Sequence, residues 1–191
     1  MTIRKIALIG HPILRKVAEP IPVDQIRSAA VQTLIDDLIE TMRDANGAGI
    51  AAPQVHESVQ VTVIEVGNNP RYPYKPKIPL TVLINPVITA LGDETFKNFE
   101  GCLSVPNLRG VVPRYARIRL TAFDREGRAI DTTYQGFTAG TMQHECDHLL
   151  GKLFVDQADP ATFTTWDFFE RFHKEHFLET TVKEVVAKYH S

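Results

Sequence analysis

The run His144-Glu145-Cys146-Asp147-His148 constrains this chain more than any other feature of its sequence. In an α-helix, residues four apart are separated by about 6 Å along the axis and by about 40° around it. The two imidazoles would therefore share one face and could bind one metal ion, with Glu145 beside them. The motif thus predicts a helix that carries a metal site, although the same pattern can arise by chance on an amphipathic helix.

A catalytic metal usually has three protein ligands and one open position, so the third ligand decides the class of site. In the metzincin pattern a glycine and then a histidine follow, but here Gly151 is followed by Phe154 at the histidine position. An apolar ring cannot bind a metal, which excludes that class. In a thermolysin-like site, Glu170 or Glu175 would be the third ligand.

The two cysteines differ in their suitability as ligands. Cys146 would point away from the imidazoles on a helix and is expected to be buried in the core. Cys102 lies in the loop-like stretch Glu100–Ser104 and could complete a Cys/His/His site. His173 and His176 could form a separate, weak metal site on the C-terminal helix.

Composition excludes several classes of protein. The chain has 191 residues, two cysteines and a net charge of −2. Near-neutral charge argues against a DNA-binding protein that depends on phosphate neutralisation. Two cysteines do not make a disulfide scaffold, and no apolar run approaches the ~20 residues that span a bilayer. We therefore expect a cytoplasmic protein without a DNA or membrane partner.

The hydrophobic pattern predicts an α+β fold, with strands in the middle of the chain and helices near both ends. The first helix is expected to start at its cap, Asp24, and to stop at Asn46-Gly47. The expected strands and later helices are 59–66, 81–84, 116–123 paired with 128–134, and then helices 137–150 and 164–189. We expect antiparallel or mixed sheets packed around the central motif helix. The expected buried stripe of the last helix is Trp166, Phe169, Phe172, Val182, Val185 and Tyr189.

Four prolines recur at every third position from Pro70 to Pro79. This spacing suits a polyproline II segment and could form a ligand for an SH3-type domain. Nothing else marks a docking motif, so a stiff surface loop between two strands is the preferred interpretation.

Three segments together resemble the peptide deformylase family. Gly47–Gln54 is similar to its G-x-G-[LI]-A-A-P-Q motif, Glu100–Ser104 to its E-G-C-L-S motif and Gln143–Leu149 to its Q-H-E-x-D-H-L motif. They occur in the family's order. The resemblance covers about residues 1–156 of a single domain, 1–191, and is weakest over the C-terminal helix, about 164–191.

The resemblance implies a metal-dependent hydrolase that removes the N-formyl group from the N-terminal formylmethionine of new polypeptides and releases formate. Carried over by position, the metal ligands are Cys102, His144 and His148, and Glu145 is the acid and base. Gln54 and the backbone N–H of Leu103 would bind the developing oxyanion, as preorganised donors do in acyl transfer.

The resemblance also implies a substrate pocket. Its expected residues are Ala48, Gly49, Glu100, Gly101, Arg109, Phe137, Gly140 and Thr141. We expect Gly49 to contact the substrate and Gly47 to end the preceding helix. Gly140 is smaller than the apolar residue common in the family, which predicts a roomier or more polar pocket. A surface salt bridge is the alternative role of Arg109.

The native metal implied by the resemblance is Fe²⁺, while Zn²⁺, Ni²⁺ or Co²⁺ could occupy the purified protein. The implied partners are N-formylmethionyl peptides and, transiently, the ribosome. Residues 164–191 contain four Lys and Arg against five Asp and Glu, so no basic ribosome-binding tail is evident. Two alternatives stay open: a zinc endopeptidase with Glu170 as third ligand, and a binding protein that has lost catalysis.

Overall fold

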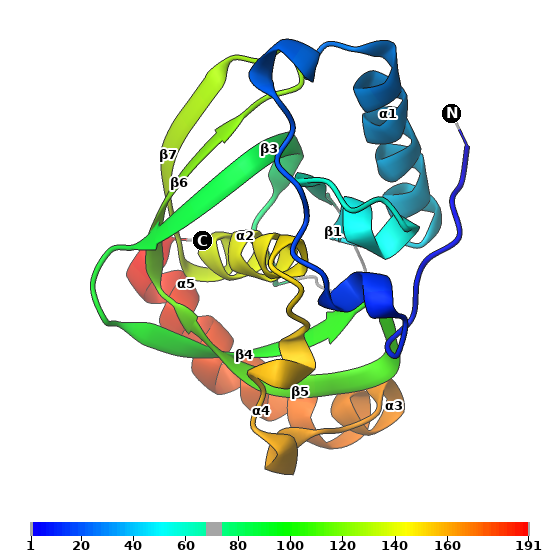
Figure 1. Cartoon of the computed structure of the whole chain (residues 1–191). Coiled ribbons are helices and arrows are strands. Elements are labelled where there is room, and N and C mark those ends of the chain that lie inside the picture. The colour runs from blue at the N-terminus through cyan, green and yellow to red at the C-terminus, as the bar shows by residue number, and fades with distance from the viewer. Residues whose placement is uncertain (1, 68–73, 191) are drawn as a thin grey trace.

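Seven strands form two separate sheets in residues 2–67 and 74–190, which the computed structural model describes (Figure 1). The five-stranded antiparallel sheet has the order β1 (Gly49–Ala51), β2 (Val61–Val66), β3 (Ile78–Ala90), β6 (Arg117–Phe123) and β7 (Ala129–Gln135). The second sheet is the antiparallel pair β4 (Thr95–Cys102) and β5 (Val105–Tyr115). The α+β prediction is therefore confirmed.

The β6–β7 hairpin follows directly from its sequence. Its inward residues Ile118, Leu120 and Ala122 are buried, and they alternate with exposed or half-buried residues. Gly127 closes the turn with a φ of +76°, which glycine adopts without strain. By contrast, the loop expected around Glu100–Ser104 is wrong: Cys102 ends β4, and only Leu103 and Ser104 turn the chain into β5.

Helix α1 (Ala29–Asp44) begins later than its sequence suggested. Asp24 lies in a short 3-10 turn, Val23–Gln25, and the cap of α1 is Ser28, whose hydroxyl accepts a hydrogen bond from the N–H of Val31. A serine oxygen satisfies this free N–H as well as an aspartate does. The predicted cap at Asp24 is therefore wrong, because the 3-10 turn separates it from the helix.

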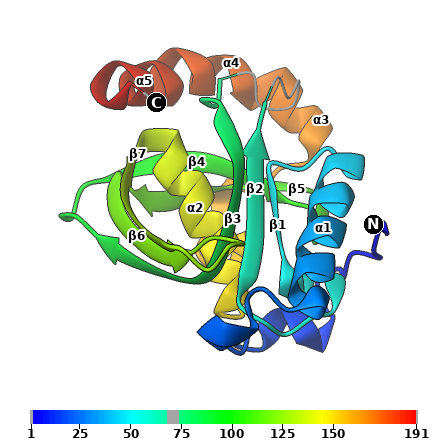
Figure 2. The ribbon, with the colours of Figure 1, turned by 90° about the horizontal axis from the view of Figure 1, so that it is seen from above.

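Helix α2 (Gly136–Leu149) carries the motif and lies between the two sheets, as both views show (Figures 1 and 2). It contacts strands of both sheets, so a helix surrounded in this way must be buried on nearly every side. The apolar residues Ala139, Met142 and Cys146 face the five-stranded sheet. Burial raises the pKa of the Cys146 thiol, which is a packing residue as expected.

The C-terminal helix, Trp166–Tyr189, lies against β4 and α2. Its α-helical parts are α3 (Trp166–Phe168), α4 (Lys174–Phe177) and α5 (Lys183–Tyr189), joined by π-helical turns. The wider turns bring Phe177 into the core in place of Phe172, which is 70% exposed, so the prediction for Phe172 is wrong. The rest of the expected stripe is buried or, at Trp166, half-buried: Phe169, Val182, Val185 and Tyr189. In the described part of the chain, no helix combines the length and apolar character needed to cross a bilayer.

The proline-spaced segment is only partly visible, because Pro70 and Pro73 lie outside the described residues. In its described part, Tyr74 and Lys75 are half-buried, whereas Lys77 and Pro79 are exposed. The ring of Tyr74 packs edge-on against Phe137 and Phe177, with centroids 5.5 and 5.4 Å away. Tyr74 therefore anchors the middle of this segment in the aromatic core beside α2.

Candidate active site

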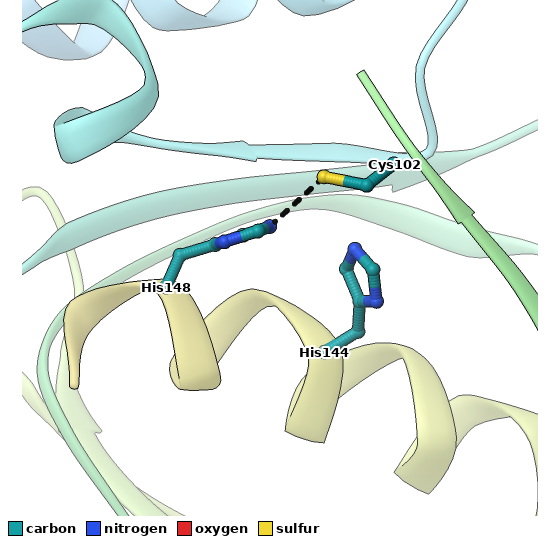
Figure 3. Close-up of side chains that lie close together, drawn as sticks. All are labelled: Cys102, His144 and His148. Carbon is teal, nitrogen blue, oxygen red and sulfur yellow. Dashed lines mark hydrogen bonds between the residues drawn. The ribbon is translucent and has the colours of Figure 1, made fainter. Parts of the chain in front are cut away.

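Three donor side chains meet where the end of β4 approaches α2 (Figure 3). One ligand atom from each of Cys102, His144 and His148 lies within 4.8 Å of the others. Sγ of Cys102 is 3.4 Å from Nε2 of His148. The helix places the imidazoles one turn apart on one face, as its periodicity requires.

The other candidate ligands lie elsewhere. Over residues 2–67 and 74–190, this is the one group of three His, Cys, Asp or Glu side chains that could hold a metal ion. Glu170 pairs with Lys174 on the C-terminal helix, and the ring centre of His173 lies 5.8 Å from that of Phe99. The geometry therefore disfavours a thermolysin-like site, whereas the weak site at His173 and His176 stays a prediction.

The donor set fits a divalent transition metal. A thiolate with two imidazoles suits Zn²⁺ and Fe²⁺, and three protein ligands leave a position for water or substrate. Burial lowers the pKa of His148 well below its usual value, so its ring is neutral, which is the form that binds a metal. Cys102 and His144 line a cavity of about 520 Å³, so a metal held by them would be accessible to a substrate.

Glu100 holds His144 in place. Its Oε2 accepts a hydrogen bond from Nδ1 of His144 at 2.8 Å, which leaves Nε2 of that ring as the nitrogen for a metal. Oε1 accepts from Nε of Arg114 at 2.7 Å, and Oε2 also accepts from Nη2 at 2.8 Å. Glu100 lines the cavity as expected, and both of its oxygens also accept hydrogen bonds, so it positions His144, while its role in binding substrate stays a prediction.

Arg114 joins the hairpin to the helix. Its side chain is 3% exposed and donates to Glu100 on β4 and, through Nη1, to Oδ2 of Asp147 on α2 at 2.6 Å. Although burial by itself raises the pKa of Glu100, the guanidinium lowers it below its usual range. Glu100 is thus ionised, and it shares one buried cation with Asp147, a pairing that no sequence motif indicated.

Glu145 is the second buried carboxyl of the site, beside Glu100. It is 5% exposed and, within the described residues, its Oε2 has no hydrogen-bond partner. Burial raises its pKa to about 7. A Cβ at Gly49 would lie 2.5 Å from Cδ of Glu145, so this glycine makes room for the carboxyl. Gly49 also lines the cavity, and its expected contact with substrate stays a prediction.

Gln54 aims its amide nitrogen at the site. Its Oε1 accepts a hydrogen bond from the N–H of Ala51 at 2.8 Å, which fixes the orientation of the amide. Nε2 lies 3.0 Å from Oγ of Ser104 and 3.5 Å from Sγ of Cys102. The amide nitrogen of Gln54, a hydrogen-bond donor, is thus held beside the three side chains that could bind a metal.

Leu103 lies in the tight turn between β4 and β5 and lines the cavity. A Cβ at Gly47 would approach Cδ1 of Leu103 to 2.9 Å, so this glycine allows the turn to pack there. The left-handed residue that ends α1 is Asn46, with a φ of +53°. Gly47 takes part in ending α1 as expected, because its N–H donates to the carbonyl of Met42 at 2.9 Å, and its lack of a side chain also leaves room for Leu103.

The cavity contains seven of the eight residues expected to bind substrate. These are Ala48, Gly49, Glu100, Gly101, Arg109, Gly140 and Thr141. Phe137 is not among the lining residues: it is 1% exposed and packs edge-on against Phe96 at 5.3 Å. Phe137 supports the wall from behind, because the first turn of α2 points it into the aromatic core.

Arg109 is buried rather than on the surface. It is 1% exposed, and Nη2 donates to the carbonyl of Phe99 at 3.0 Å. The guanidinium carbon lies 4.1 Å from the ring centre of Phe169 and 4.7 Å from that of Trp166. The surface salt bridge considered for Arg109 is therefore wrong, since aromatic rings enclose this cation.

Lys75 is a pocket residue that the sequence patterns did not identify. Its ammonium group donates to Oγ1 of Thr141 at 3.2 Å, and burial lowers its pKa to about 8. A Cβ at Gly140 would lie 3.1 Å from Cζ of Phe96, so that ring already fills part of the space beside the glycine. The geometry agrees with the more polar form of the pocket expected at Gly140.

Comparison with known proteins identifies the relatives of the chain. A model of the polypeptide deformylase family matches residues 3–163. Peptide deformylase 2 of Ralstonia nicotianae is 46% identical over 168 residues, which cover 88% of this chain and 93% of the relative.

Two solved structures share the fold. The Met-Ala-Ser-bound class I type b peptide deformylase from Acinetobacter baumannii has a TM-score of 0.79 and 38% identity, and the match covers 82% of this chain and 98% of that one. A peptide deformylase from Legionella pneumophila has a TM-score of 0.73 and 33% identity, with 96% of this chain and 95% of that one covered.

The buried guanidinium of Arg114 is expected to stabilise the folded protein. Arg114→Met leaves Glu100 buried without its counter-charge, and we expect the free energy of unfolding to fall by about 3–5 kcal/mol. Urea denaturation at neutral pH measures this change. The matched control is Arg119→Met, which breaks the exposed pair with Asp131 and should have little effect. A loss at Arg114 no larger than that at Arg119 would contradict the assignment.

Proposed function

This chain belongs to the polypeptide deformylase family, and we propose that Cys102, His144 and His148 hold the metal on which its activity depends, with Glu145 as acid and base. The reaction is metal-dependent hydrolysis of the N-formyl group at an N-terminal formylmethionine, which releases formate. The observation that carries the residue assignment is the meeting of three donor atoms beside a cavity that Cys102, His144, Glu145 and Gln54 line.

Glu145 is suited to move a proton. A metal held by the three donors would supply a Lewis acid that acidifies water near neutral pH. Glu145 accepts a proton from that water at its buried Oε2 and passes it to the amine nitrogen as the carbon–nitrogen bond breaks. Water thus adds across the formyl amide, and the products are formate and a free N-terminus.

Gln54 and Leu103 are suited to stabilise negative charge on the formyl oxygen. Nε2 of Gln54 is already directed toward Cys102, so no rearrangement of the amide is needed to donate to an oxygen there. The backbone N–H of Leu103, in the turn that follows Cys102, is the second donor. Donors fixed before the reaction stabilise an oxyanion more effectively than mobile water does.

The peptide is expected to lie extended along β1. This strand is at the edge of the five-stranded sheet, and Ala48 and Gly49 line the cavity. An edge strand offers backbone N–H and C=O groups to an added peptide strand. We place the first side chain against Gly140 and Thr141 of α2, where Lys75 makes that wall polar.

Three broader assignments belong to the same proposal. We treat residues 1–191 as one domain, because the C-terminal helix packs its buried stripe on β4 and α2. We assign a cytoplasmic location, since new polypeptides are the substrates. Contact with the ribosome is expected to be transient, because the C-terminal helix is not basic.

The ligand assignment is tested by metal content and formate release. Cys102→Ala is expected to lose bound metal and to release no formate from formyl-Met-Ala-Ser, because two imidazoles alone hold a divalent ion weakly. Glu170→Ala, which breaks only the exposed contact with Lys174, is the control and should keep both. Metal retained by Cys102→Ala and lost by Glu170→Ala would overturn the assignment.

We propose Fe²⁺ as the native metal, with Zn²⁺, Ni²⁺ or Co²⁺ as substitutes. Cys102 is partly exposed to the cavity, so oxygen can reach both the thiolate and a ferrous ion. Protein purified without oxygen should therefore contain iron and lose formate release during exposure to air. Full activity after prolonged exposure, with zinc as the bound metal, would contradict the iron assignment.

A further inference from the structure

The cavity wall includes a residue from beyond the segment that the family model matches. That match ends at residue 163, whereas Trp166 at the start of the C-terminal helix lines the cavity together with Asn107, Leu108 and Arg109. Trp166 is the single tryptophan of the chain and is half-buried. Trp166 is not among the residues proposed as acid, base, metal ligand or oxyanion donor.

Trp166 is held in the wall by the chain on both sides of it. Arg109 and Thr164 exchange two backbone hydrogen bonds of 2.8 and 3.0 Å, which add the preceding segment to the edge of β5. The backbone N–H of Trp166 donates to Oδ1 of Asn107 at 3.2 Å. The segment that leads into the C-terminal helix is therefore hydrogen-bonded to β5, which contributes Asn107, Leu108 and Arg109 to the cavity wall.

The indole ring of Trp166 also packs against the side chains of Arg109 and Phe169. The guanidinium of Arg109 lies 4.7 Å from its ring centre, and the ring of Phe169 lies 6.5 Å away. Arg109 in turn is anchored to the carbonyl of Phe99 on β4. A ring held in this way loses little conformational entropy when a ligand contacts it, which favours recognition.

We propose that Trp166 is a specificity-determining residue that contacts a substrate side chain downstream of the formylmethionine and favours an aromatic one. The inference rests on the proposed function, which places the formyl group at Cys102 and the first side chain at Gly140 and Thr141. Trp166 belongs to a different wall, formed with Leu108 and Arg109. Offset or edge-on contact between aromatic rings stabilises a complex beyond the burial of apolar area alone.

The kinetic test compares peptides within one enzyme preparation. We expect kcat/KM to be higher for formyl-Met-Phe-Ala or formyl-Met-Ala-Phe than for formyl-Met-Ala-Ala, and Trp166→Ala to lower that ratio by about three- to tenfold. The matched control is Phe172→Ala, whose side chain on the same helix is 70% exposed and outside the cavity lining. Because each ratio is taken within one variant, a general loss of folded enzyme cancels.

A second measurement needs no variant. Since Trp166 is the single tryptophan, its fluorescence reports directly on the cavity wall. The products Met-Phe-Ala and Met-Ala-Phe are added to the metal-loaded enzyme, with Met-Ala-Ala as reference. A saturable change in emission with at least one aromatic peptide, larger than that with Met-Ala-Ala, supports the proposal.

The outcomes separate the two proposals. If the wild-type enzyme releases formate from all three peptides but Trp166→Ala keeps the wild-type ratios and emission is equal for all products, the role of Trp166 is overturned while the function stands. If the metal-loaded wild-type enzyme releases no formate from any peptide, the proposed function itself fails.

Discussion

The buried guanidinium of Arg114 is the contact on which the arrangement of the active site depends. It pairs with Glu100 on β4 and with Asp147 on α2, and thereby joins the hairpin that carries Cys102 to the helix that carries both histidines. Isolating such charges from water is costly unless each has a partner. The two elements therefore have one satisfactory relative position, and this position brings the three donor atoms together.

The same need to pair buried polar groups explains the hydrogen bonds made by the polar side chains of α2. Gln143 bonds to both backbone groups of Tyr115, His144 to Glu100, and Asp147 to Arg114. Each bond links α2 to the β4–β5 hairpin, while the apolar side of the helix packs on the five-stranded sheet. Glu145 and His148 are the exceptions, because Oε2 of Glu145 and Nδ1 of His148 have no hydrogen-bond partner among the described residues. Of the carboxylates in this network, Glu145 thus keeps one oxygen for chemistry.

How much could be predicted depended on whether a residue belongs to a local pattern. Helical spacing placed His144 and His148 on one face, and strand alternation located the β6–β7 hairpin. The positions of Glu100, Gly49 and Phe137 followed from the motifs, but their contacts did not, because those depend on Arg114, Glu145 and Phe96 from distant segments. Lys75 and Trp166 enter the cavity from segments without a motif, so only the fold reveals them. Asp24 shows that a capping residue cannot be placed when a 3-10 turn precedes the helix.

The central claim is that a metal at Cys102, His144 and His148 acts together with the buried carboxyl of Glu145. Glu145→Gln preserves the shape of this side chain and removes its ability to accept a proton. The direct measurement is formate release from formyl-Met-Ala-Ser by wild type and variant, with bound metal determined in the same preparations. The account predicts equal metal content and a loss of activity of about 10²-fold or more in the variant. Unchanged formate release by a variant with a full complement of metal would contradict it.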